Sequence, residues 1–245
     1  KLSPEADRVT LIRRVSFDLT GLPPTPEDVA AFVKDDSDDA WERQIDRLLV
    51  SEAHGERMAT YWLDLVRYAD TVGYHGDQDH SISPYRDWVI DAFIENMPFD
   101  RFTVEQLAGD LVEDSGIDQK IASGYNRLLQ TTHEGGLQPR EYLAIYAADR
   151  IRNLSEVWMG GTMGCCQCHN HKFDPYTIED FYSLGAFFAD LDEAKHFTSG
   201  GNSLPTKREP ELVVLTRRER LRIDELKQEI AGINVASQHV ANGNA

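Results

Sequence analysis

The chain has 245 residues with 41% hydrophobic and 27% charged side chains, which is ordinary for a globular protein and excludes wholesale disorder and collagen-like repeats. Twenty-five Lys and Arg against 42 Asp and Glu give a net charge of −17, so nucleic acids and anionic membranes are not expected as partners, since both attract cationic surfaces. No stretch of the sequence reaches the roughly 20 apolar residues that a membrane-spanning helix needs.

The N-terminal part of the sequence has the apolar spacing of amphipathic helices. Apolar residues recur at helical spacing from Val9 to Leu19, and the two prolines that follow end the pattern because proline removes a backbone donor. Thr25 predicts the start of a second helix, since threonine is a favoured N-cap and proline follows at the first helical position. A third helix is expected after the acidic run at 35–39, which we interpret as a solvated helix start rather than a calcium loop.

Further helical patterns follow along the chain, and alternation of β-branched residues is nearly absent. The expected helical ranges are 56–70, 84–97, 103–108, 117–130, 139–152 and 178–191. Residues 73–80 read as a polar connecting loop rather than a metal site. The sequence therefore predicts a mostly α fold, an irregular multi-helix domain with long loops.

The C-terminal part of the chain differs in composition from the rest. Residues 198–210 begin with a Gly- and Ser-rich stretch that predicts a linker, and a charged helix is expected at about 215–233. Its apolar residues follow a 3-4 spacing over two heptads, which is too short to indicate a coiled coil. We therefore expect a helical domain at 6–197, a linker at 198–210, and a C-terminal helix and tail at 211–245 that leads toward a further domain.

The three cysteines of the chain lie within four positions, which is too clustered for a disulfide framework. Cys165, Cys168 and His169 form the C-x-x-C-H pattern of c-type haem attachment. The spacing suits this chemistry, because two thiols bond to one edge of the porphyrin and the following histidine binds the iron. The motif predicts covalent haem c at Cys165 and Cys168, with His169 as the proximal iron ligand. Cys166 falls outside the pattern.

Two other interpretations of the cysteine cluster remain open. Zinc is one, because the three cysteines with His169 and His171 supply suitable ligands, although structural zinc sites usually draw on two separated pairs. A redox-active C-x-x-C is the other, but no βαβ pattern surrounds the motif.

Four segments of the sequence carry a family resemblance. They are WLDLVRYADT at 62–71, YRDWVI at 85–90, EQLAGDL at 105–111 and CCQCHNHKFDP at 165–175. In this order they resemble the second planctomycete cytochrome-like domain, a family of unknown function with a c-type haem motif, and the likeness covers roughly residues 6–192. The resemblance implies a position between a small cytochrome c domain and a further domain in longer proteins. At Cys166 the family pattern more usually has a small residue without a thiol.

The second axial ligand of the iron would decide between an electron carrier and a catalyst, since an open position can bind peroxide or small gases. The side chains that could supply this ligand are Met159, Met163, His133, His171 and His196. Met163 also fits core packing. His171 follows His169 too closely to reach the opposite haem face easily, so a hydrogen bond or a separate metal contact suits it better.

A group of polar residues lies within the family-like part of the chain. Asp64, Arg67 and Asp70 are expected to share one face of a helix, because residues three apart meet on that face. The other members of the group are Glu134, Asp149, Arg150, His171 and Asp174. Together they predict either a salt-bridge network that holds the helices around the haem, or a site beside the haem that binds a cation or moves protons.

These observations favour a monohaem c-type cytochrome-like protein that transfers electrons. Covalent haem attachment takes place outside the cytoplasm, so we expect a periplasmic or cell-surface location and a mature or excised portion of a longer chain. The acidic surface suits a redox partner with a basic patch, such as a cytochrome c domain of the same or a neighbouring chain. The alternatives are a peroxidase-like haem enzyme with an open distal site, and a non-haem metal or carbohydrate-associated module with structural Cys and His.

Overall fold

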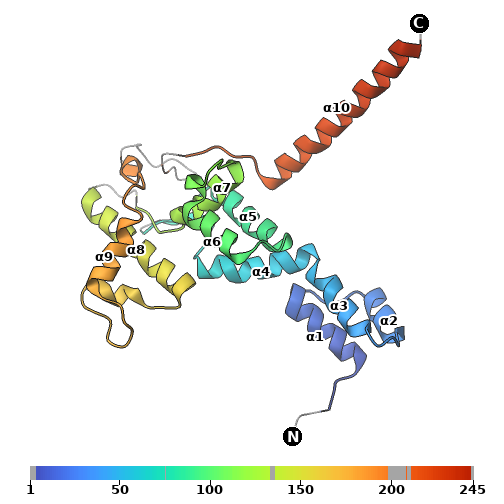
Figure 1. The fold of residues 1–245 in the computed structure, drawn as a ribbon, viewed down its shortest axis with the longest axis horizontal. Coiled ribbons are helices and arrows are strands. Elements are labelled where there is room, and N and C mark those ends of the chain that lie inside the picture. Colours follow the sequence, from blue (N-terminus) through green and yellow to red (C-terminus); the bar gives the residue numbers. More distant parts are fainter. Residues whose placement is uncertain (1–3, 75, 133–135, 198–207, 209–210, 244–245) are drawn as a thin grey trace. The chain divides into compact units, whose positions relative to one another are not determined.

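The structure, a computed structural model, describes residues 4–74, 76–132, 136–197, 208 and 211–243. Its contacts divide the chain into two compact units, Lys1–Pro210 and Glu211–Ala245. The described residues are mostly helical and include two short strands (Figure 1), which confirms the predicted mostly α fold.

The first unit, Lys1–Pro210, is built from α-helices joined by loops and short 3-10 helices. Its α-helices are α1 (Arg8–Thr20), α2 (Pro26–Lys34), α3 (Ala40–Leu49), α4 (Glu52–Leu65), α5 (Ser83–Ile94), α6 (Phe99–Ala108), α7 (Ile117–Ala122), α8 (Pro139–Met159) and α9 (Ile178–Ala186). Its 3-10 helices are η1 (Gly109–Leu111), η2 (Ser123–Arg127), η3 (Met163–Gln167) and η4 (Ala194–Phe197). The strands β1 (Thr71–Val72) and β2 (Gln78–Asp79) form an antiparallel hairpin.

The first three helices pack around a small apolar core of their own. Ile12 of α1, Phe32 of α2 and Ala40 of α3 are buried against one another. The helix boundaries follow local chemistry: Thr25 caps α2 in a capping box with Asp28, as predicted from the sequence. The α1 helix contacts α2, α3 and α4, which joins this part to the rest of the unit.

The centre of the first unit is aromatic. The helices α4, α5, α6 and α7 lie side by side in Figure 1, with contacts between α4 and α5 and between α7 and both α5 and α6. Trp62, Trp88 and Phe102 stack or meet edge-on at ring-centroid distances of 4.8 Å and 5.4 Å. Gln106 is fully buried among them, and its Oε1 accepts hydrogen bonds from Trp62 Nε1 at 2.9 Å and from the Tyr85 hydroxyl at 2.6 Å.

Replacing Gln106 by Leu is expected to lower the free energy of unfolding by about 2 kcal/mol, because two buried donors lose their shared acceptor. Denaturant unfolding followed by tryptophan fluorescence measures the effect. Gln138→Leu is the matched control, since Gln138 is exposed and makes no capping hydrogen bond. Equal stability of the two variants would contradict a structural role for the Gln106 hydrogen bonds.

The α8 helix crosses this aromatic centre. Trp158 meets Trp62 edge-on at 5.2 Å and Tyr125 at 4.9 Å. Asn153 accepts a hydrogen bond from the Tyr125 hydroxyl at 2.9 Å and donates one to the Leu65 carbonyl at 3.1 Å. The helix therefore connects the central helices to the segment that follows it, where the cysteine motif lies.

Several predicted boundaries were wrong. The helix expected at 56–70 ends at Leu65, and the one expected at 117–130 is divided into α7 and η2. The polar loop expected at 73–80 contains β2, paired with β1. The hairpin closes tightly at Gly73, whose φ is +146°, because a Cβ there would lie 2.0 Å from the Gly76 carbonyl oxygen.

The second unit, Glu211–Ala245, contains the helix α10 (Arg217–Gly243). Thr216 starts it, since the Thr216 side chain accepts from the backbone N–H of Glu219 at 3.3 Å and the Glu219 carboxylate accepts in return at 2.8 Å. Apart from Arg208, residues 198–207 and 209–210 of the expected linker lie outside the described residues.

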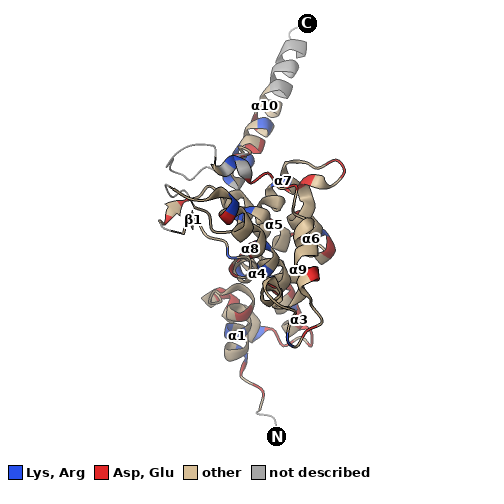
Figure 2. Cartoon of the chain, turned by 90° about the vertical axis from the view of Figure 1, so that its left-hand side faces the viewer, with Lys and Arg blue, Asp and Glu red and all other residues tan. Residues whose placement is uncertain are grey.

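Acidic residues are distributed over many elements of the chain. Figure 2 shows Asp and Glu positions on several of them, including α3 and the segment that leads into α7. None of the helices within the described ranges has the length and apolar character needed to cross a membrane.

Candidate functional site

The cysteine motif lies on η3, a 3-10 turn that packs against α8 and α9. Cys165 and Cys168 are exposed, Cys166 is fully buried, and all three thiols are free. Cys165 in the turn and Cys168 directly after it are both exposed to solvent, whereas Cys166 is directed into the protein.

Cys166 belongs to the core beneath the motif. It packs with Met163, Ile151 and Phe181, and its thiol donates a hydrogen bond to the Tyr176 carbonyl at 3.5 Å. Met163, a candidate for the second axial ligand, is 2% exposed in the same cluster. Cys166 and Met163 therefore both pack in this core, whereas the thiols of Cys165 and Cys168 are exposed.

His169 is exposed at the end of the turn. Its Nδ1 lies 2.8 Å from the Asn170 carbonyl oxygen, which can only accept, so Nδ1 carries the proton. Nε2 then has a free lone pair, and no described residue hydrogen-bonds to it. A histidine held by one ring nitrogen on a backbone carbonyl is the usual arrangement of a metal-ligating imidazole.

His171 has both ring nitrogens engaged. Its Nδ1 accepts hydrogen bonds from the backbone N–H groups of Phe173 at 3.2 Å and Asp174 at 2.8 Å. Its Nε2 therefore carries the proton and donates to the Thr162 hydroxyl oxygen at 2.9 Å. An oxygen of the Asp174 carboxylate lies 3.4 Å from the same Nδ1. His171 holds the loop after the motif in place and is not free to bind a metal without losing these bonds.

Exposed apolar side chains border the motif. Phe173 is 84% and Tyr182 is 60% exposed, and the Tyr182 hydroxyl donates to the Gln167 carbonyl at 3.2 Å. The backbone N–H of Ile178 donates to the Asn170 side chain at 3.0 Å, which places the start of α9 beside the motif. The donor set of two exposed thiols and a free imidazole nitrogen fits covalent haem attachment.

The expectation that Asp64, Arg67 and Asp70 share a helix face was wrong. The α4 helix ends at Leu65, and Arg67 adopts a left-handed φ of 61°. The backbone N–H of Arg67 bonds to the Asp64 carbonyl and that of Tyr68 to the Leu63 carbonyl, the pattern of a Schellman motif. The helix thus stops five residues before Asp70, which a shared face would have to include.

The polar residues of the predicted group have separate partners. Arg67 forms a two-pronged ion pair with Asp149 of α8, at 2.8 Å and 2.9 Å. Asp70 accepts a hydrogen bond from the Tyr68 hydroxyl at 2.7 Å, and Asp64 is exposed. Arg67 and Asp149 are therefore the members of the group that the fold brings together across a long sequence separation.

Some predicted residues cannot be placed in the site. Residues 133–135 lie outside the described residues, which includes His133 and Glu134, and so does the side chain of His196. Met159 lies at the exposed end of α8. Within the described ranges, no group of three or more His, Cys, Asp or Glu side chains is arranged to hold a metal ion.

The structure contains a buried ionic cluster. The sequence analysis singled out one member, Arg150, and missed the others. One oxygen of Glu193, Oε1, accepts from Arg150 and from Arg208, each at 2.7 Å. The Arg150 and Arg208 side chains are 3% and 4% exposed, and Arg208 also lies over the ring of Tyr146 at 5.3 Å. Arg208 exchanges backbone-carbonyl hydrogen bonds with Arg127, which brings a third guanidinium to the cluster. No local sequence pattern predicts these pairings, because they join residues 15 to 81 positions apart.

The charge of this cluster acts on His80. Burial, followed by the charges of Arg208 and Arg127, lowers the pKa of His80 to about 4 from 6.5. The imidazole is therefore neutral in the folded protein at physiological pH.

His80 is expected to make the folded protein sensitive to acid. Because its folded pKa is lower than its unfolded pKa, its contribution to stability is fully present above pH 6.5 and is lost as the pH falls toward 4. Because His80 is partly exposed, the expected effect is smaller than the full pKa shift would give. Between pH 7 and 4 the free energy of unfolding of the wild-type chain should fall by about 2 kcal/mol more than that of His80→Gln. Urea unfolding of both proteins across this range measures the difference, and parallel pH profiles would refute the assignment.

Comparison with known proteins gives one match. No curated protein and no solved structure matches the chain. Residues 1–193 match the family described as "PSCyt2: Protein of unknown function (DUF1549)", a stretch that includes the cysteine motif, the Arg67–Asp149 pair and Glu193. The chain belongs to this PSCyt2 family of unknown function.

Proposed function

We propose that this chain is a monohaem c-type cytochrome-like protein that transfers electrons outside the cytoplasm. The observation that carries the proposal is the division of the three cysteines: Cys165 and Cys168 are exposed, and Cys166 is buried. The free Nε2 of His169 supports the same interpretation. The planctomycete and cytochrome-like character implied by the sequence resemblance belongs to this proposal.

Each residue of the motif has a separate role in the proposal. The thiols of Cys165 and Cys168 would hold the haem by adding across its two vinyl groups, with sulfur on one carbon and hydrogen on the other, which would need no oxidant. His169 offers Nε2 to the iron while the Asn170 carbonyl orients its ring. Cys166 is withheld from the reaction by its burial. When bound, haem supplies reversible one-electron transfer.

The partner we propose is a redox protein with a basic patch, such as a cytochrome c domain of the same or a neighbouring chain. The net charge of −17 favours such a partner, because opposite charges accelerate encounter. Association should weaken as salt is added, since exposed charges are screened. Association that is insensitive to salt would argue against this choice of partner.

A second candidate is a haem enzyme with an open distal position. It is favoured by the engagement of two side chains that were candidates for the second axial ligand. Met163 is buried in the core cluster, and both nitrogens of His171 hold the loop after the motif. An axial position without a strong protein ligand can bind peroxide or small gases.

Production of the chain in a host that matures c-type cytochromes tests the proposal. Haem staining on a denaturing gel, with ferric and ferrous absorption spectra, should reveal covalent haem. A low-spin ferric spectrum supports the electron carrier, and a high-spin spectrum that responds to peroxide supports the enzyme. Protein without haem, carrying one zinc per chain, would overturn both and favour a structural role for Cys165, Cys168 and His169.

A further inference from the structure

A cavity of about 440 Å³ lies in the first unit, away from the cysteine motif in sequence. Its walls are the segment from Arg67 to Gly73, the β2 side of the hairpin, and residues 127–130. The Tyr74 backbone N–H donates to the Thr131 carbonyl at 3.1 Å, which ties the hairpin to the 127–130 segment. Cavities of this size are typical of small-molecule sites.

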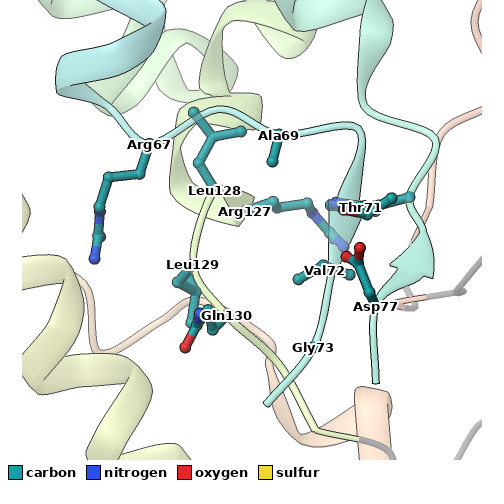
Figure 3. Close-up of a pocket in the computed structure, with 11 residues that line it drawn as sticks. Arg67, Ala69, Thr71, Val72, Gly73, Asp77, Arg127, Leu128, Leu129 and Gln130 are labelled. Atoms are coloured by element: carbon teal, nitrogen blue, oxygen red, sulfur yellow. The ribbon is translucent and has the colours of Figure 1, made fainter. Parts of the chain in front are cut away.

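Charged side chains approach the cavity from opposite sides. Figure 3 shows Arg67 on one side, and on the other Arg127 and Asp77 with their side chains directed toward each other. Arg67 is 45% exposed although its Nη1 and Nη2 atoms bond to Asp149. A guanidinium has five N–H groups, and those of Arg67 that face away from Asp149 remain available to a ligand within the described structure.

The backbone of Arg67 determines where its side chain lies. Its φ of 61° is the left-handed conformation that the helix-ending motif of α4 requires, and Asn96 adopts the same conformation after α5, with a φ of 51°. The turn places Arg67 at the cavity, and the ion pair with Asp149 fixes the orientation of the guanidinium.

The charges of the described residues around the cavity favour an anion. Arg67 and Arg127 line it, and Arg150 and Arg208 lie behind the 127–130 segment, where Arg150 donates to the Asn126 carbonyl at 3.0 Å. Among the side chains that line the cavity, two arginines stand against one carboxylate, that of Asp77, while Asp149 pairs with Arg67 and Glu193 pairs with Arg150 and Arg208. His80 also lines the cavity, and its pKa is lowered chiefly by burial and then by the charges of Arg208 and Arg127.

The remaining polar groups narrow the ligand class. Asp77 would repel a plain inorganic anion, but its carboxylate can accept hydrogen bonds from hydroxyl groups. Thr71 and Gln130 add further donors and acceptors to the wall. We infer that this cavity binds a small hydroxylated carboxylate, such as a sugar acid, with Arg67 contacting the carboxylate group and Asp77 contacting hydroxyls. The inference does not depend on haem, because the described lining residues are distinct from the cysteine motif.

Isothermal titration of the full chain with D-glucuronate tests the inference, with glucose as a neutral control of similar size and with acetate and inorganic phosphate as anions. Glucuronate should bind at least about tenfold more tightly than glucose, because a charge-assisted hydrogen-bonded pair is stronger than a neutral one. It should also bind at least about tenfold more tightly than acetate, because acetate has no hydroxyl groups to donate to Asp77. Equal affinity for glucose, a preference for phosphate, or no binding would each overturn it.

Two variants that break the same ion pair separate recognition from structure. Arg67→Gln should weaken glucuronate binding by about tenfold or more, whereas Asp149→Asn should keep or improve it, because Arg67 is retained and loses a competing carboxylate. Both variants break the Arg67–Asp149 ion pair, and circular dichroism checks that they remain folded. Loss of binding in both would contradict the inference, since it would assign the effect to the shape of the loop.

Discussion

The double variant Cys165→Ala/Cys168→Ala is expected to carry no covalent haem when made in a host that matures c-type cytochromes. Both exposed thiols that would form thioethers are then absent. Haem staining of the denatured protein measures the effect. Absorption then compares the haem that can be extracted with the haem that stays on the protein. The expected loss is complete, because the third cysteine faces the core and lies at the wrong spacing.

Cys166→Ala is the matched control for the double variant. It also removes a thiol from the same turn, but the fully buried Cys166 should not take part in attachment. We expect unchanged covalent haem and a loss of stability of about 1 kcal/mol from the core cluster. Loss of haem in Cys166→Ala with retention in the double variant would contradict the assignment of the thiols.

Replacing Glu193 by Gln is expected to lower the free energy of unfolding by about 3–5 kcal/mol. The physical reason is that one carboxylate oxygen accepts hydrogen bonds from two guanidinium groups, on Arg150 and Arg208, that are almost completely buried. Without the Glu193 carboxylate, the two buried guanidinium charges would lack both a partner of opposite charge and full hydration by water. Chemical denaturation followed by far-UV circular dichroism measures the change.

Asp192→Asn provides the control for the Glu193 variant. Asp192 is the preceding residue, and its ion pair with Lys195 at 2.8 Å is solvent-exposed. Exposed pairs contribute little, so no measurable change in stability is expected. Similar stability of the Glu193 and Asp192 variants would show that the buried cluster does not stabilise the first unit.

Local sequence chemistry predicted parts of the fold correctly. Thr25 and the following proline predicted the start of α2, because capping depends on the residues adjacent to the helix end. The end of α4 could not be predicted in this way. It depends on Arg67 in a left-handed conformation, a place where glycine is the usual signal, and the ion pair with Asp149 lies 82 residues away.

The candidate site was predictable to a similar extent. The C-x-x-C-H spacing identified Cys165, Cys168 and His169, but spacing alone does not say which thiol faces the core. The burial of Cys166 follows from its packing against α8 and α9, which the spacing does not show. The cavity and its charges arise from residues on separate segments, such as Arg67, Asp77 and Arg127, that carry no shared pattern in the sequence.

The central claim, haem attachment through the outer two cysteines, is tested most directly by mass spectrometry of the wild-type chain matured in such a host. Trypsin should release residues 153–172 as one peptide, because no Lys or Arg lies between Arg152 and Lys172. After alkylation of the denatured protein, this peptide should carry one haem and one alkyl group, with the alkyl group on Cys166. Three alkylated cysteines and no haem on this peptide would contradict the claim.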